Sequence, residues 1–184
     1  MRISFAATLA APVLAGLVLA TPARAQISND DVARVKQYMV CEGTLSKACE
    51  LFMKGAFAEA RAAFRAAADA GEAGALNNLG VLHENGAGVP RNAVRAVEWY
   101  RKAAEGGVAA AQYNLAMLTA GDHIFGGADP LRRDEDMAAA YMWLSLSADQ
   151  KFALAVETLE ELGRFLTKPQ MAAAQKRLRA RRGK

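Results

Sequence analysis

The stretch FRAAADAGEAGALNNLG, residues 64–80, returns 36 residues later as YRKAAEGGVAAAQYNLA, residues 100–116. At this offset Asn78 aligns with Asn114. Self-similarity at a period of roughly 20–50 residues is typical of stacked repeats, whose units cannot bury their apolar faces alone. The period therefore predicts a repeat array with a binding surface, but it does not identify the partner that binds there.

Apolar residues at spacings of three and four predict the helices of this array. Residues 92–105 place alanine, valine and tyrosine on one side and charged residues on the other, and Gly106 and Gly107 end this helix. The same reasoning predicts helices over residues 57–70, 74–85 and 109–120.

Small and large residues alternate along the predicted helices. Alanines at matching positions let neighbouring helices approach closely, and aromatic residues fill the space on either side. The Gly-, Asp- and Pro-containing stretch 121–137 is predicted to be an inserted loop. The fold class is therefore all-α, a helical-hairpin solenoid of about three to four repeats. The alanines are Ala60, Ala96 and Ala140, and the large residues are Phe64, Trp99, Tyr100 and Trp143.

The first 25 residues have the pattern of a secretory signal peptide. A short basic start precedes an uncharged apolar run, and TPARA supplies small residues for cleavage between Ala25 and Gln26. We expect an exported chain, most simply in a bacterial periplasm, with a repeat domain over residues 26–166. A capping helix with a basic tail is expected over residues 167–184.

Charge is segregated along the chain. Residues 26–163 carry 13 Lys and Arg against 19 Asp and Glu, whereas residues 164–184 carry eight basic residues and no acidic one. The basic tail is interpreted as a solvated last helix that frays, the alternative being a site for anionic lipid or nucleic acid. Export and the lack of interleaved aromatic residues argue against nucleic acid.

The chain contains two cysteines, Cys41 and Cys49. We expect a helix over residues 28–40 with an apolar stripe of Val32, Val35 and Met39, a stop at Gly43, and a second helix from near Thr44. The cysteines then face each other across a turn, and an oxidising compartment favours a disulfide between them. Free thiols and a redox pair are the alternatives, although no C-x-x-C motif supports the latter.

Residues 79–116 resemble the Sel1-like repeat, a helix-turn-helix relative of the tetratricopeptide repeat. The match consists of Leu79-Gly80, the turn Gly86-Ala87-Gly88-Val89, Ala96 with Trp99-Tyr100, and Ala103-Ala104 with Gly107.

Two further stretches resemble parts of this family. Residues 138–150 are similar to the second helix of another copy, and residues 166–178 to a closing helix capped by Thr167. The resemblance covers roughly residues 57–178 and implies a right-handed superhelix. It also implies that the first helix of each hairpin lines the concave face.

Five residues are expected to point outward from those first helices and to bind a partner. Amide and carboxylate groups can hydrogen-bond an extended peptide, and aromatic and methionine side chains offer apolar contact. The alternative is that Val81, Tyr113 and Met117 are core residues between adjacent repeats. The candidate partner-binding residues are Asn77, Val81, Glu84, Tyr113 and Met117.

No motif for a nucleophile, a phosphate loop or a zinc site occurs in the chain, so no catalytic residue, cofactor or metal is predicted. His83 is interpreted as structural, with a charge that could favour a helix end. His123, with Asp122 and Asp129, is at most a weak candidate for holding a cation.

These observations favour a non-enzymatic scaffold of the bacterial envelope that binds a protein or peptide through its concave face. One alternative is an envelope hydrolase of the β-lactamase-like kind claimed for cysteine-rich members of the family. The other is a module that binds anionic lipid or cell-wall polymer through the basic tail. Neither the partner's identity nor the oligomeric state follows from the sequence.

Overall fold

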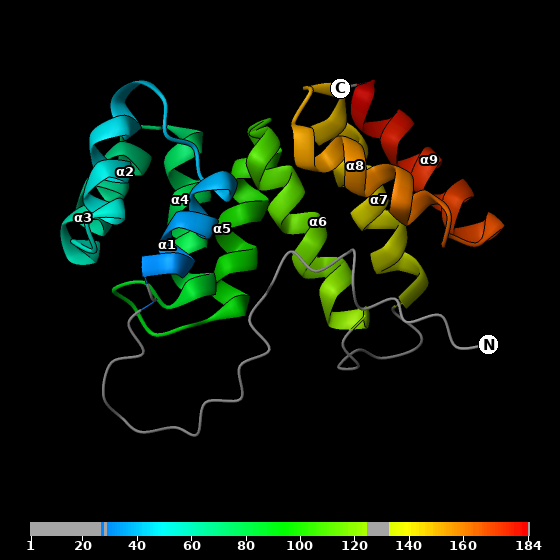
Figure 1. Ribbon diagram of the computed structural model, residues 1–184. Helices are drawn as coiled ribbons and strands as arrows, with labels where there is room; N and C mark the ends of the chain where they lie inside the picture. The colour runs from blue at the N-terminus through cyan, green and yellow to red at the C-terminus, as the bar shows by residue number, and fades with distance from the viewer. Residues whose placement is uncertain (1–26, 28, 125–132, 184) are drawn as a thin grey trace.

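The computed structural model describes Ile27 and residues 29–124 and 133–183, and within these ranges the chain forms helices and no strand (Figure 1). The predicted signal peptide lies outside the described residues. The helices are α1 (Asn29–Val35), η1 (Lys36–Tyr38), η2 (Gly43–Leu45), α2 (Ser46–Met53), α3 (Phe57–Asp69), α4 (Ala73–Asn85), α5 (Ala93–Glu105), α6 (Ala109–Ile124), α7 (Arg133–Asp149), α8 (Ala153–Gly163) and α9 (Lys168–Arg182).

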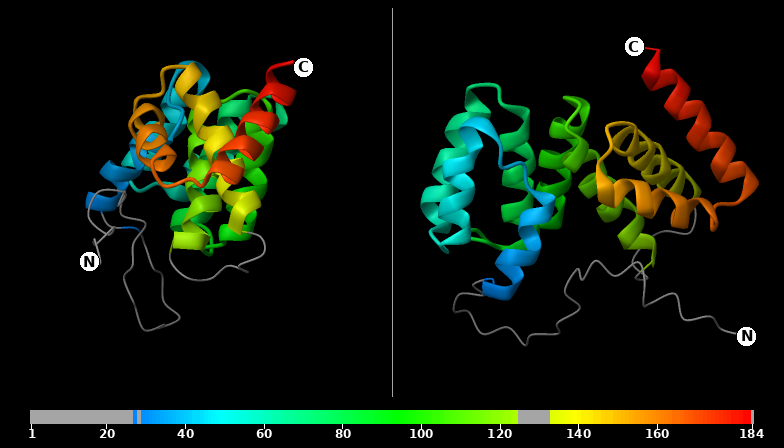
Figure 2. Two further views of the ribbon diagram at one scale, coloured as in Figure 1. Left: turned by 90° about the vertical axis from the view of Figure 1, so that its right-hand side faces the viewer. Right: turned by 45° about the horizontal axis from the view of Figure 1, so that its top comes forward.

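Helices α2 to α7 follow one another as neighbours, each packed against the next, and α7 packs against both α8 and α9 (Figures 1 and 2). The hairpins α2–α3, α4–α5 and α6–α7 correspond to successive units of the repeat. The predicted all-α repeat solenoid is confirmed, as are the four helices predicted from apolar periodicity, to within a few residues at their ends.

Close packing between α4 and α5 depends on Gly80. A Cβ placed there would lie 2.6 Å from two ring atoms of Tyr100, which is fully buried. Phe64 is also fully buried, and Trp143 is 6 % exposed. Trp99 is half-buried beneath the cationic groups of Arg65 and Lys102. The large residues are therefore buried or half-buried among the helices, and Tyr100 packs between α4 and α5 of one hairpin.

The turn between α4 and α5 also needs glycine. Gly86 ends α4 with φ at 70°, and Gly88 has the same left-handed φ. At Gly88 a Cβ would lie 2.7 Å from the Cβ of Phe57, so this turn packs directly on the preceding hairpin. Asn92 then caps α5, its side-chain oxygen accepting from the amide of Arg95 at 2.9 Å.

Three expectations about helix boundaries are wrong. The helix expected over residues 28–40 ends at Val35 and continues as η1, after which Met39 is extended. The expected loop 121–137 is shorter, since α6 runs to Ile124 and α7 begins at Arg133. Helix α8 was not predicted.

The last helix packs on α7, while most of its basic side chains are exposed, in keeping with the expected solvated tail. Its N-terminus has the capping box expected from Thr167 and Gln170. The guanidinium of Arg181 lies 4.3 Å from the ring centroid of Trp143, and Arg182 pairs with Asp149 at 2.5 Å. Part of the basic charge of α9 is therefore engaged with α7. No helix within the described ranges is both long enough and apolar enough to cross a membrane.

The predicted disulfide is formed between Cys41 and Cys49, whose Cα atoms are 5.7 Å apart. It ties the N-terminal segment, residues 29–41, to α2. The described residues contain no free cysteine.

A double variant, Cys41→Ser and Cys49→Ser, is expected to unfold with a free energy about 2–3 kcal/mol lower than the wild type, because the bridge closes a short loop and restricts the unfolded chain. Urea denaturation with and without reductant measures this difference. The wild type should lose the same amount on reduction, whereas the double variant should not respond to reductant. Equal midpoints for all four samples would contradict the prediction.

Candidate functional site

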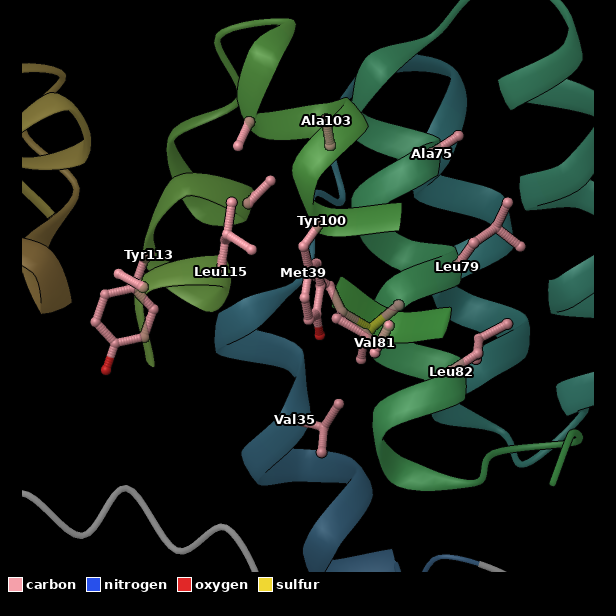
Figure 3. Packing of buried hydrophobic residues seen from close by; sticks show 14 of the residues in the cluster. Val35, Met39, Ala75, Leu79, Val81, Leu82, Tyr100, Ala103, Tyr113 and Leu115 are labelled. Carbon is pink, nitrogen blue, oxygen red and sulfur yellow. The ribbon is translucent and has the colours of Figure 1, made fainter. Parts of the chain in front are cut away.

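The N-terminal segment lies across α4 and α6, on the face to which the concave residues were assigned. Figure 3 shows Val35 and Met39 of this segment facing the helices, and Met39 belongs to the same buried cluster as Tyr100 and Val81. Val32, Val35 and Met39 are each less than 9 % exposed. The chain therefore covers part of the face that carries the predicted partner-binding residues.

Asn78 holds the extended part of this segment by its main chain. Its side-chain oxygen accepts from the amide of Val40 at 2.8 Å, and its side-chain nitrogen donates to the carbonyl oxygen of the same residue at 2.7 Å. The amide side chain thus pairs with both polar groups of one residue, much as a neighbouring strand would.

Two further asparagines, Asn77 and Asn114, bind the carbonyl oxygen of Tyr38. Asn77 donates to it at 2.9 Å and Asn114 at 3.0 Å. Asn114 also donates to the side-chain oxygen of Asn77 at 3.0 Å. Asn77 is fully buried and Asn114 is 5 % exposed, so these bonds form away from solvent, where an unpaired amide is costly.

Asn78 and Asn114 occupy equivalent positions of the repeat and contact residues two apart in the bound segment. The first of these repeats thus binds both Val40 and Tyr38, and the second binds Tyr38. Neither Asn78 nor Asn114 was among the predicted partner-binding residues, although the repeat aligns them. Polar residues recurring among apolar neighbours were the signal that could have identified them.

Tyr113 provides an aromatic contact beside these amides. Its ring lies parallel to that of Tyr38, with centroids 6.0 Å apart, and is tilted against Phe152 at 5.5 Å. Burial raises the pKa of Tyr113 to about 12. Its hydroxyl group therefore remains protonated at neutral pH, and its ring provides an uncharged apolar contact.

The other three predicted residues lie on the same helices. Val81 is fully buried and Met117 is half-buried. The carboxylate of Glu84 accepts from the hydroxyl of Tyr100 at 2.6 Å. Two of the five predicted partner-binding residues contact the N-terminal segment. Asn77 donates a hydrogen bond to the carbonyl oxygen of Tyr38, and the ring of Tyr113 stacks on the ring of Tyr38.

Glu84 is a half-buried carboxyl group in this site. Burial raises its pKa, while the hydroxyl of Tyr100 and the charge of Arg91 lower it to a smaller extent. Because the folded-state pKa lies above that of the unfolded chain, ionisation of Glu84 opposes folding. Its contribution to stability is fully present below the unfolded-state pKa and is lost as the pH rises through the folded-state value.

A Glu84→Gln variant is therefore expected to gain stability relative to the wild type as the pH rises from about 4 to 7, because glutamine keeps an acceptor for Tyr100 without the charge. Urea denaturation at a series of pH values measures this gap. Glu98→Gln, at an exposed position of α5, serves as the control, and its difference in stability from the wild type should not grow with pH. The prediction would be contradicted if the difference in free energy of unfolding between Glu84→Gln and the wild type stayed constant or became smaller as the pH rises.

The histidine and acidic residues assemble no metal site in the described part of the chain, where no cluster of three or more His, Cys, Asp or Glu side chains occurs. Asp129 lies outside the described residues. Burial lowers the pKa of His83, and the charges of Arg95 and Arg61 lower it further. The neutral form is thereby favoured, so the expectation that a charged His83 stabilises the helix end is not supported.

Comparison with known families identifies the repeat. The model described as Sel1 repeat matches residues 73–108 and 109–152, the α4–α5 and α6–α7 units. The chain contains two Sel1 repeats. Sel1 repeats generally serve as scaffolds for protein interaction, and the fold is typically non-catalytic.

A solved structure shares the fold of this Sel1-repeat protein. It is a protective antigen present in uropathogenic Escherichia coli strains that displays an SLR fold, and it matches with a TM-score of 0.59 and 24% identity. The match covers 82% of this chain and 31% of the antigen, so the chain spans about a third of that molecule. No curated protein matches the chain.

Proposed function

We propose that this Sel1-repeat protein is a non-enzymatic scaffold of the bacterial envelope and binds a partner protein by an extended peptide on the face formed by α4 and α6. The supporting observation is the pairing of Asn78 with both main-chain polar groups of Val40. These bonds recognise an extended backbone, which is the feature shared by peptides of any sequence.

The envelope assignment has two sources of support. The sequence begins with the pattern of a secretory signal, and Cys41 and Cys49 form a disulfide. Disulfides persist in oxidising compartments such as the periplasm and are rare in the cytosol.

The basic tail is a less favoured site. Three of its cations already have partners within the fold. Arg181 lies over Trp143, Arg182 pairs with Asp149, and Arg177 donates to the carbonyl oxygen of Glu135 at 2.8 Å. A tail that binds anionic polymer would make binding fall steeply with salt, since exposed charges are screened.

Site-specific crosslinking in the envelope tests the proposed function. A diazirine amino acid in place of Met117 lies on α6 one turn from Tyr113, whereas one in place of Val94 lies on α5, where the side chain is 71 % exposed. We expect a protein partner to be captured from position 117 and not from position 94. Capture from position 94 alone, or from neither position, would contradict the proposal.

A further inference from the structure

We infer that residues Tyr38–Val40 are an intramolecular ligand of the concave face. A partner peptide would then bind by replacing them, with an aromatic residue two positions before an aliphatic one. This inference rests on the proposed function and adds to it both the chemistry of the partner and the step that limits its binding.

The main-chain contacts are of the kind that a separate peptide would make. Asn78 pairs with Val40, and Asn77 and Asn114 donate to Tyr38, so the amides contact only the backbone of the segment in these bonds. None of them depends on the segment being part of the same chain.

The side chains of the segment define three contacts that a partner would have to reproduce. Tyr38 stacks on Tyr113, and Met39 points into the core, where it is 8 % exposed. Val40 packs over Gly74, where an added Cβ would lie only 2.9 Å from its Cγ1 atom. This glycine departs from the repeat, since the equivalent residue of the next unit is Ala110. The face therefore fits an aromatic, a long apolar and a β-branched residue in that order.

The segment is suited to exchange because it precedes the repeats in the chain and has little stability of its own. Helix α1 has seven residues, too few for a stable helix in isolation, so its order depends on the face that it covers. Residues 33, 34, 36 and 37 are exposed. The bond between Cys41 and Cys49 fixes the segment at its C-terminal end and keeps it at a high effective concentration near the site.

An occupied site lowers the affinity measured for any competitor, because only the fraction of molecules with a free site can bind it. Weakening the segment without changing the face should therefore strengthen peptide binding. Tyr38→Ala removes the stacking contact with Tyr113 and leaves the three asparagines intact. Lys36→Ala, an exposed change in the same segment, is the matched control.

The probe is a fluorescent synthetic peptide with the sequence of residues 34–41, carrying Cys41→Ser. Fluorescence anisotropy should show that the Tyr38→Ala protein binds this peptide at least about tenfold more tightly than the wild type or Lys36→Ala does. A second peptide that also carries Tyr38→Ala should bind the Tyr38→Ala protein about tenfold less tightly than the first, since it lacks the stacking ring.

Hydrogen exchange in the wild type provides a readout that does not depend on how the variant folds. Saturating peptide should speed exchange at the protein's own Val40 amide, because the segment has been displaced. Equal affinities for the wild type and the Tyr38→Ala protein, or bound peptide with Val40 still protected, would overturn the exchange step and leave the proposed function standing. Absence of peptide binding by every protein, including Tyr38→Ala with an exchanging Val40 amide, would overturn both.

Discussion

A Gly80→Ala variant is expected to unfold with a free energy about 2 kcal/mol lower than the wild type. Alanine is the better helix former by about 1 kcal/mol, but overpacking a filled core costs about 1–3 kcal/mol or more. The clash is severe here because the added Cβ would lie 2.6 Å from the ring of Tyr100. That ring is fully buried, and its hydroxyl is bonded to Glu84, so it has no room to move away.

Three further proteins separate the clash from helix propensity: Gly121→Ala, Tyr100→Ala, and the double variant that combines Gly80→Ala with Tyr100→Ala. Gly121→Ala, on α6 with no atom within 4 Å of the added Cβ, should be neutral or stabilising by up to about 1 kcal/mol. In a Tyr100→Ala background the cost of Gly80→Ala should vanish, because the clashing ring is gone. Urea denaturation of all these proteins provides the comparison. An equal loss from Gly80→Ala in both backgrounds would rule out the proposed packing.

An Asn78→Leu variant is expected to lose up to about 3 kcal/mol of stability, because it leaves the amide and carbonyl groups of Val40 without partners in a buried setting. The loss should appear first as release of the N-terminal segment and only partly as unfolding of the repeats. Limited proteolysis should therefore cut the variant within residues 29–41 while α4 and α5 remain intact.

The control for Asn78→Leu is Gln175→Leu, which makes a similar change at an exposed position of α9. It should change stability by no more than about 0.5 kcal/mol and leave the segment resistant to protease. Cleavage of both variants at the same rate as the wild type would show that Asn78 does not hold the segment.

The repeat units could be predicted because their signals are local and periodic. Apolar spacing placed α3 to α6, and the recurrence of small and aromatic residues predicted that Phe64 and Trp143 are buried. The capping pair of Thr167 and Gln170 located the start of α9. Each of these features is decided by residues within about one repeat of each other.

The path of residues 36–41 could not be predicted because tertiary contacts decide it. The apolar spacing of Val35 and Met39 is equally consistent with a continuing helix, which is what the sequence analysis expected. Bonds from α4 and α6 to Tyr38 and Val40 instead accompany a short 3-10 helix over residues 36–38 that ends at an extended Met39. Local propensity is a weak guide wherever such distant partners compete with it.

The position of the N-terminal segment also explains what the predicted partner-binding residues contact. Residues on the first helices of the hairpins were expected to meet a partner, and Asn77 and Tyr113 do contact an extended segment. That segment belongs to the same chain, and nothing in its apolar spacing indicates that it binds there. Binding of a separate peptide there remains a proposal.

Native-state hydrogen exchange at the amide of Val40 tests most directly whether repeated asparagines hold an extended backbone. This amide donates to the side chain of Asn78 and lies outside any helix, so its protection reports on that contact. Slow exchange in the wild type, lost in Asn78→Leu while the amides of α4 stay protected, is the predicted result. Exchange at the rate of an unfolded chain in the wild type would contradict it.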